Sequence, residues 1–290
     1  MKIYLNGKMV EKEEARVSVF DHGFLYGDGA FEGIRAYSGV VFRLKEHIDR
    51  LYETCHTMMI NTGLTKKQMI EAVVKTLKAN GLTDGYIRLV VTRGDGDLGL
   101  DPRKCKGNPN IIIIADKITL YPEEFYKNGL AIVTVPTVRN HIEAINPQLK
   151  SLNYLNNIMA KIEANNAGVP EAIMLDGNGY VAECTGDNIF MVKGGVLKTP
   201  QQGRLRGITR DTVMELAATK CKIKVEETFI TRHEFFNADE CFLTGTAAEL
   251  IPVIKIDGRI IGTGKPGPVT AKLLKLFHDV TRKDGVKYSL

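Results

Sequence analysis

The sequence LKSLNYLNNIMAKIEANN at positions 149–166, followed by EAIMLDGNGYVAECTGDNIF at 171–190, decides the fold. Apolar residues at 152, 155, 159 and 162 recur every three or four positions, which predicts one apolar face of a helix. Gly168 and Pro170 end that helix. The apolar run 172–175, the turn 176–179 and the run from 180 onward then predict a β-hairpin.

Two ionisable residues frame this helix and hairpin. Lys150 comes just before the predicted helix, and Glu183 lies on the second strand of the hairpin. A lysine at a helix start faces the positive end of the helix dipole, and burial also disfavours its charged form. A neutral lysine amine is a nucleophile that forms Schiff bases. By spacing alone a solvated lysine is the commoner outcome, because lysine is rarely buried without a partner.

The sequence motifs of this region also resemble those of a known family. KSLNYLNN at 150–157, EAIMLD at 171–176 and GYVAE at 179–183 resemble the branched-chain aminotransferases of the fold-type IV pyridoxal-phosphate (PLP) class. The resemblance implies a two-domain α+β or α/β fold, with a smaller N-terminal α/β domain and a larger C-terminal domain that has a β-barrel-like core. PLP would lie at the domain interface. We place the domains at 1–118 and 130–290, with a connector at 119–129.

The resemblance also implies roles for cofactor-binding residues. Lys150 would hold PLP covalently and serve as general acid and base, while Glu183 would contact the pyridine nitrogen and Tyr154 the phenolic oxygen. Arg50 would bind the phosphate, because its planar, permanently charged fork matches phosphate oxygens. Leu205 would stack on the ring. The predicted phosphate-binding turns contain Gly207, Ile208, Thr209, Gly245 and Thr246.

One of these turns opens a predicted helix at 208–217. Thr209 or Asp211 can cap it, and Val213, Leu216 and Ala217 would face inward. Backbone amides at a helix start that is entered through a glycine form an anion site. Most capped helices bind nothing, so the phosphate role rests on the family resemblance.

Substrate contacts are implied in the same way. Tyr26, Phe31 and Gly33 would form the wall of the side-chain pocket, and small residues there allow close backbone approach. Tyr86 and Arg88 would bind carboxylates. Leu100 would line the pocket of a neighbouring subunit, and Thr246 and Ala247 would offer amides to the substrate carboxylate. The implied activity is ping-pong transamination between L-branched-chain amino acids and 2-oxoglutarate, in a homodimer or a hexamer built from dimers.

Other activities share this fold. The step of four residues from Lys150 to Tyr154 also resembles the D-amino acid aminotransferases, but those usually lack this tyrosine and the FEGIR string at 31–35. Aminodeoxychorismate lyases share the fold too, although Arg88 and the GTAA turn at 245–248 favour transamination. Cys184 replaces the glycine that usually follows the glutamate.

A rival class is a dinucleotide-dependent oxidoreductase, because residues Gly94 to Gly99 read GDGDLG directly after a predicted strand. Three features oppose it. Pro102 follows where a helix should begin, Asp95 and Asp97 would meet a pyrophosphate, and no alternating strand–helix pattern extends the motif. We therefore predict a loop.

Composition excludes several other functions. The chain has 290 residues, a net charge of +5 without charged blocks, and apolar runs too short to span a bilayer, so neither nucleic acid nor membrane is implied. Five scattered cysteines without a Cys-x-x-Cys pair predict a reducing, cytoplasmic setting. The histidines and cysteines show no metal-ligand spacing, so we expect no metal site.

Overall fold

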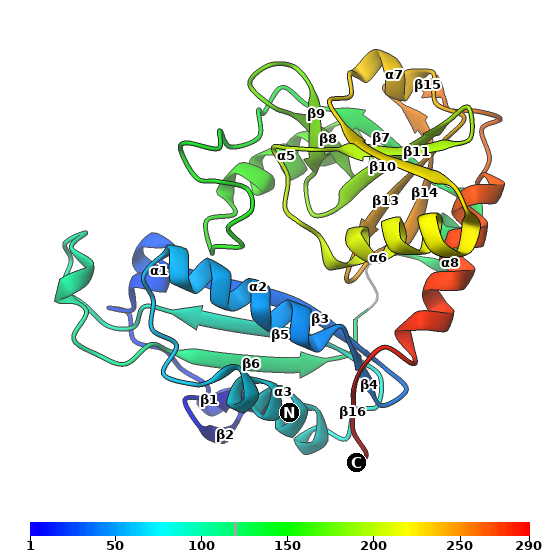
Figure 1. The fold of residues 1–290 in the computed structure, drawn as a ribbon. Coiled ribbons are helices and arrows are strands. Elements are labelled where there is room, and N and C mark those ends of the chain that lie inside the picture. Colours follow the sequence, from blue (N-terminus) through cyan, green and yellow to red (C-terminus); the bar gives the residue numbers. More distant parts are fainter. Residues whose placement is uncertain (119–120) are drawn as a thin grey trace. The chain divides into compact units, whose positions relative to one another are not determined.

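The computed structural model describes residues 1–118 and 121–290, which form two compact units (Figure 1). The first unit comprises 1–118, 149–153 and 280–290. The second comprises the described residues of 119–148 together with 154–279. Each unit has its own sheet and its own hydrophobic core.

The first unit is built on a seven-stranded antiparallel sheet of order β16-β4-β3-β5-β6-β1-β2. Two of its central strands, β5 and β6, are rich in β-branched residues, which suit a pleated surface. The strands are β1 (Lys2–Leu5), β2 (Lys8–Glu11), β3 (Gly29–Tyr37), β4 (Val40–Phe42), β5 (Gly85–Thr92), β6 (Ile111–Asp116) and β16 (Gly285–Lys287).

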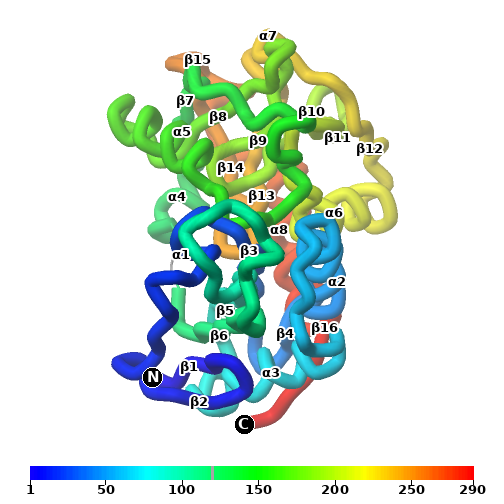
Figure 2. The backbone as a smooth tube through the Cα atoms, turned by 90° about the vertical axis from the view of Figure 1, so that its left-hand side faces the viewer, coloured from blue at the N-terminus to red at the C-terminus, as the bar shows by residue number. Residues whose placement is uncertain are grey.

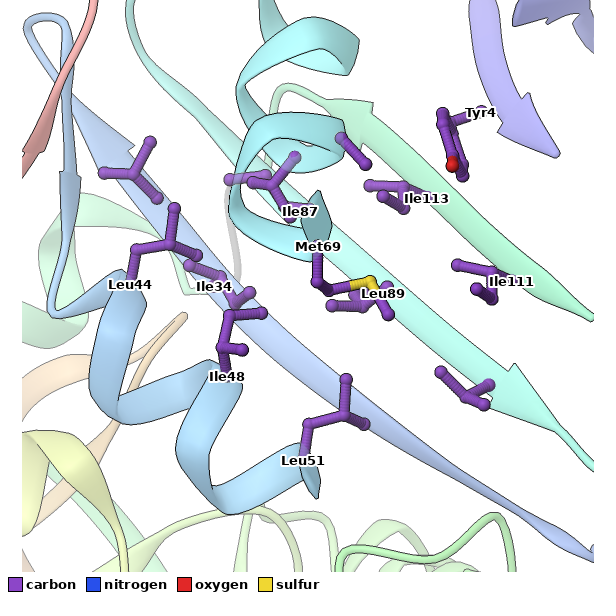
Figure 3. Packing of buried hydrophobic residues seen from close by; sticks show 14 of the residues in the cluster. Tyr4, Ile34, Leu44, Ile48, Leu51, Met69, Ile87, Leu89, Ile111 and Ile113 are labelled. Atoms are coloured by element: carbon purple, nitrogen blue, oxygen red, sulfur yellow. The ribbon is translucent and has the colours of Figure 1, made fainter. Parts of the chain in front are cut away.

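Two helices, α2 (Leu44–Thr57) and α3 (Lys66–Ala79), cover one face of this sheet (Figures 1 and 2). Leu44, Ile48 and Leu51 recur on the inward face of α2, as their spacing predicts, and pack with Met69 of α3 and Ile87 of β5 (Figure 3). Thr65 and Gln68 form a capping box that fixes the start of α3. The short helix α1 (His22–Tyr26) precedes β3.

The second unit is built on a nine-stranded mixed sheet of order β12-β11-β10-β13-β14-β7-β8-β9, with β15 paired to β14. The edge strand β9 also lies against β10 and β11, so the sheet curls back on itself and forms the expected barrel-like core. The strands are β7 (Leu130–Thr134), β8 (Ala172–Leu175), β9 (Val181–Cys184), β10 (Asn188–Lys193), β11 (Val196–Pro200), β12 (Lys224–Thr228), β13 (Glu240–Gly245), β14 (Glu249–Ile256) and β15 (Arg259–Ile260).

Five α-helices accompany this sheet among the described residues. They are α4 (Glu123–Asn128), α5 (Leu155–Asn166), α6 (Ile208–Leu216), α7 (Arg232–Phe236) and α8 (Pro268–Thr281). The predicted helix and hairpin of the central stretch are α5, β8 and β9. The predicted apolar face of α5 does not pack into the core, because Leu155, Met159 and Ile162 are exposed. Ala160 and Ala164 are buried instead, since small side chains let the helix approach β8 closely.

The compact units differ from the predicted domains in two places. The prediction put all of 130–290 into the C-terminal domain, whereas residues 149–153 and 280–290 group with the first unit. Residues 149–153 bond to β3, and β16 pairs with β4. The predicted connector contains α4, whose Tyr126 hydroxyl donates to the Ala248 carbonyl oxygen within the second unit.

Residues 94–99 form a loop, as predicted, and the surrounding structure contradicts the dinucleotide-binding alternative. The chain continues from this loop into a short 3-10 turn at Pro102–Lys104, with no α-helix start there. The preceding strand β5 pairs antiparallel with both β3 and β6. A dinucleotide fingerprint requires a parallel strand–helix–strand unit, so its phosphate-binding helix end does not form here.

Three further findings concern the described residues. No helix within 1–118 or 121–290 is both long and apolar enough to cross a membrane. No group of three or more histidine, cysteine, aspartate or glutamate side chains in these ranges is arranged to hold a metal ion. All five cysteines are free thiols.

Candidate active site

Lys150 lies in an extended segment beside β3 and not at a helix start, so that part of the prediction is wrong. Helix α5 begins only at Leu155. The Lys150 carbonyl oxygen instead accepts a hydrogen bond from the Phe31 amide (2.9 Å), and the Leu152 amide donates to Gly29 (2.9 Å). Strand-type pairing therefore fixes the lysine backbone.

The structure brings Lys150 together with two predicted substrate residues in the first unit. The Lys150 Nζ lies 4.4 Å from the centroid of the Phe31 ring, and the Arg88 Cζ lies 4.6 Å from the same centroid. The Arg88 Nη2 donates to the Tyr86 hydroxyl (3.2 Å). Within the described residues, the buried Arg88 Nε has no hydrogen-bond partner. This arginine can therefore still donate to a carboxylate.

A side chain on the adjacent strand leaves no room for a Cβ atom at Gly33. It pairs with Arg88 across β3 and β5, and a Cβ atom at this position would lie 2.2 Å from the Tyr86 hydroxyl. The close approach expected at Gly33 is thus to Tyr86. The Tyr26 hydroxyl donates to the Leu98 carbonyl oxygen, and Leu100 lies in the same loop with 79% of its surface exposed.

Arg50 is held by a buried glutamate that the sequence did not single out. Its Nε and Nη2 donate to the two carboxylate oxygens of Glu32, both at 2.8 Å, and the His47 ring contacts Glu32 Oε2 at 2.8 Å. Burial raises the pKa of Glu32, but the Arg50 charge and the His47 contact outweigh burial and lower it to about 2. Burial lowers the pKa of His47 below its ordinary value. The guanidinium therefore faces a permanent carboxylate that fixes its orientation.

Glu183 on β9 accepts three hydrogen bonds in the second unit. Its Oε1 accepts from the Arg139 Nε (2.8 Å), and its Oε2 accepts from the Leu205 amide (2.9 Å) and the Asn188 Nδ2 (3.2 Å). Every one of these partners is a donor, which suits an ionised carboxylate. Leu205 is predicted to stack on a ring, a role that stays a prediction; its amide is a direct partner of Glu183. Arg139 and Asn188 were missed by the sequence reasoning.

The two predicted phosphate-binding turns also lie in the second unit. Gly207 is the N-cap of α6, and no side chain caps this helix, so the predicted capping by Thr209 or Asp211 is wrong. Ile208 and Thr209 occupy the buried first turn, where backbone amides have no partner within the helix. Val213, Leu216 and Ala217 face inward, as predicted.

The second turn joins β13 to β14 and contains Gly245, Thr246 and Ala247. The Thr244 Oγ1 beside it is buried, with no hydrogen-bond partner within the described residues. A Cβ atom on Gly245 would lie 2.0 Å from the Asp187 Oδ1, so only glycine allows this approach. The turn thus presents backbone amides and one unused hydroxyl.

Asp187 belongs to a buried acidic cluster behind this turn. Burial and the nearby Glu171 carboxylate raise its pKa to about 7, against the lowering effects of the Lys161 charge and the Tyr121 hydrogen bond. Glu171 accepts from the Ala172 amide (2.7 Å) and the Thr185 amide (3.0 Å) through Oε1. At neutral pH a substantial share of Asp187 is therefore protonated.

Tyr154 is the N-cap residue of α5 and forms no capping hydrogen bond. It belongs to the second unit, whereas Lys150 belongs to the first, so the chain passes from one unit to the other between Asn153 and Tyr154. The predicted site residues therefore form two sets. The first unit holds Tyr26, Phe31, Gly33, Arg50, Tyr86, Arg88, Leu100 and Lys150, and the second holds Tyr154, Glu183, Leu205, Gly207, Ile208, Thr209, Gly245, Thr246 and Ala247.

Known proteins resemble this chain in both sequence and structure. A Methanocaldococcus jannaschii protein, provisionally named a branched-chain-amino-acid aminotransferase, is 56% identical over 289 residues, which is 99% of each chain. A D-alanine aminotransferase from Bacillus licheniformis is 36% identical over 278 residues, with 93% of each chain covered.

Solved structures of branched-chain amino acid aminotransferases also resemble this chain. The Escherichia coli branched-chain amino acid aminotransferase superposes with a TM-score of 0.94 and 35% identity, covering 98% of this chain and 96% of that one. The Thermobaculum terrenum branched-chain amino acid aminotransferase, in its PLP-bound holo form, gives a TM-score of 0.87 and 30% identity, covering 97% and 94%. The sequence also matches the family Amino-transferase class IV over residues 29–256. The chain therefore belongs to the class IV aminotransferases.

Proposed function

We propose that this protein is a PLP-dependent aminotransferase that moves the amino group of L-branched-chain amino acids to 2-oxoglutarate in a ping-pong reaction. Family membership supports the reaction class, and the names of the relatives support the branched-chain substrates. The observation that carries the proposal is the buried Glu183 carboxylate, whose three partners are all donors.

The residues present fit PLP. A carboxylate surrounded by donors can accept one more hydrogen bond from a protonated ring nitrogen, which is the role we assign to Glu183. The uncapped start of α6 at Gly207, Ile208 and Thr209 fits a phosphate, as does the turn with the unused Thr244 hydroxyl. Gly245 and Thr246 would add amides. When bound, PLP supplies an electron sink for charge that develops at the substrate α-carbon.

The residues of the first unit would attach the cofactor and bind substrate. Lys150 would hold PLP covalently through Nζ and then move the proton at the substrate α-carbon. Arg50, fixed by Glu32, would bind phosphate oxygens. Arg88 and Tyr86 would bind a substrate carboxylate, beside a pocket wall made by Phe31, Gly33 and Tyr26. Leu205 and Tyr154 of the second unit would contact the ring, and Thr246 and Ala247 the substrate carboxylate.

A D-amino acid aminotransferase is the second candidate. The Bacillus licheniformis D-alanine enzyme is 36% identical to this chain, the same figure as the Escherichia coli branched-chain enzyme. Identity to these two relatives therefore does not separate the two activities. The higher identity of the Methanocaldococcus jannaschii relative and the presence of Tyr154 favour L-branched-chain substrates.

We also propose that the protein forms homodimers, alone or within a hexamer. The segment with Val19 and Phe24 lies beside the loop of Leu98 and Leu100, since the Gly96 amide donates to the Phe20 carbonyl oxygen at 3.1 Å. All four of those apolar side chains are exposed, and contiguous apolar surface marks association sites. Light scattering after gel filtration would measure the mass, and a monomer would contradict the proposal.

Screening amino donors against 2-oxoglutarate tests the proposed function. We expect turnover with L-leucine, L-isoleucine and L-valine that greatly exceeds turnover with D-alanine, and loss of all turnover in Lys150→Ala. Product 2-oxo acids would be quantified by chromatography. A preference for D-alanine would replace the L-specific assignment, and full activity of Lys150→Ala would refute the role of the lysine.

A further inference from the structure

We propose that Arg139 is a positioning residue that acts through Glu183: it fixes this carboxylate as an oriented acceptor for the cofactor ring nitrogen. The inference deepens the proposed function and rests on the role given there to Glu183. Arg139 would not touch PLP or substrate itself. Its contribution would be the orientation and charge of the group that does.

The hydrogen bonds of Glu183 leave it little freedom to rotate. An ionised carboxylate offers about four acceptor positions, and three are used by Arg139, Leu205 and Asn188. Donors engage both oxygens, so rotation about the last side-chain bond would break bonds on each of them. One acceptor position is left, and it suits a single N–H donor.

Arg139 is itself held firmly, although it lies in a loop. Its side chain is 6% exposed, its backbone amide donates to the Leu175 carbonyl oxygen (2.8 Å), and its Nη1 donates to the Asn156 Oδ1 (3.1 Å). Asn156 on α5 also binds the loop on both sides of Arg139. It donates to the Val138 carbonyl oxygen (2.8 Å) and accepts from the Asn140 amide (3.2 Å).

Arg139 also supplies a positive charge next to the buried Glu183 carboxylate, with its Nε 2.8 Å from Oε1. A buried carboxylate without a cationic partner is costly and tends to take up a proton. A protonated carboxyl group still has acceptor oxygens, but it has lost the negative charge that makes a carboxylate a strong acceptor for a protonated ring nitrogen. Arg139 is therefore a cation that contacts the Glu183 carboxylate directly and compensates its charge.

A double-mutant cycle on the PLP-loaded enzyme tests the proposal. We expect Arg139→Met to lower kcat about 10- to 100-fold, the usual cost of losing a group that orients a primary ligand, while KM for the amino donor changes little. We also expect the visible absorption maximum of bound PLP to move, as it should in Glu183→Gln. In the Glu183→Gln background, Arg139→Met should cost no more than about twofold, because its target is already lost.

Two further variants and a control make the result decisive. Arg139→Lys keeps the charge without the planar fork and should recover part of the loss. Asn156→Ala keeps the Arg139–Glu183 ion pair but removes the hydrogen bond that holds the guanidinium. It should therefore lower kcat less than Arg139→Met does, and it should have little effect in the Glu183→Gln background. Arg259→Met, at an exposed position of the same unit, should leave kcat and the spectrum unchanged.

The outcomes separate this inference from the proposed function. If the wild type forms no PLP absorption band or transfers no amino group, the proposed function fails and this inference fails with it. If the wild type is active and Glu183→Gln is impaired, but Arg139→Met costs the same factor in both backgrounds, then Arg139 does not act through Glu183. An unshifted absorption maximum in both Arg139→Met and Asn156→Ala would overturn the inference as well.

Discussion

At the scale of single residues, the residues proposed to contact the cofactor were easier to predict from the sequence than the residues that hold them in place. Lys150 and Glu183 were identified because they lie in distinctive strings. The structure fixes the Lys150 backbone against β3 and holds the Glu183 carboxylate with three donors. Arg139 lies in a loop without periodicity, and Glu32 reads as an ordinary strand residue. Arg139 pairs with Glu183, 44 positions away, and Glu32 pairs with Arg50, 18 positions away. Local sequence patterns do not predict pairs that are so far apart.

Asp187 gives a residue-scale prediction about stability. Its pKa is raised in the folded protein, so the folded state binds this proton more tightly than the unfolded chain. The stabilising contribution is complete below the unfolded pKa of 3.8 and is lost as the pH rises through about 7. Asp187→Asn is neutral at every pH, so it should gain stability relative to the wild type between pH 4 and 7, by up to about 4 kcal/mol.

Urea unfolding at a series of pH values would measure this gain. Asp279→Asn, at an exposed position, controls for the substitution itself. A difference between Asp187→Asn and the wild type that stays constant from pH 4 to 8 would show that burial does not perturb this carboxyl group.

At the scale of elements, the sequence predicted that helix α5 forms, but it did not predict which side of the helix packs against the sheet. The periodicity of the central stretch correctly predicted α5, yet its apolar residues point outward and its alanines inward. Packing against β8 selects small side chains, because a close helix–sheet approach leaves no room for leucine. The helix start was also placed too early, since strand-type bonds to β3 hold residues 150–152 in an extended form.

Strand β16 supplies an element-scale prediction. It pairs with β4, and Tyr288 beyond it donates from its hydroxyl to Leu82 (2.6 Å) and from its amide to Gly39 (2.9 Å). Truncation after Asp284 should therefore lower the opening free energy of the β4 amides by about 1–3 kcal/mol. Hydrogen exchange would measure this change.

The matched control is Tyr288→Phe, which keeps the strand and removes one hydrogen bond, so its effect should be about 1 kcal/mol. Amides of β13 in the second unit should keep more of their protection than those of β4. Equal losses in β4 and β13 would show that β16 does not stabilise the first unit specifically.

At the scale of the whole molecule, the fold class was predictable because motifs matched along most of the chain, and the barrel-like sheet of the second unit follows that expectation. The return of two segments of the chain to the first unit was not predictable. Segments 149–153 and 280–290 join the first unit through strand pairing with distant residues, and neither hydrophobic period nor composition encodes such long-range partners.

The central claim is that Lys150 holds PLP covalently, and one measurement tests it most directly. The PLP-loaded protein would be reduced with borohydride and digested, and its peptides would be mapped by mass spectrometry. We predict a reduced phosphopyridoxyl adduct on the peptide that contains Lys150, and none in Lys150→Ala. An adduct on another lysine, with Lys150 unmodified, would contradict the account.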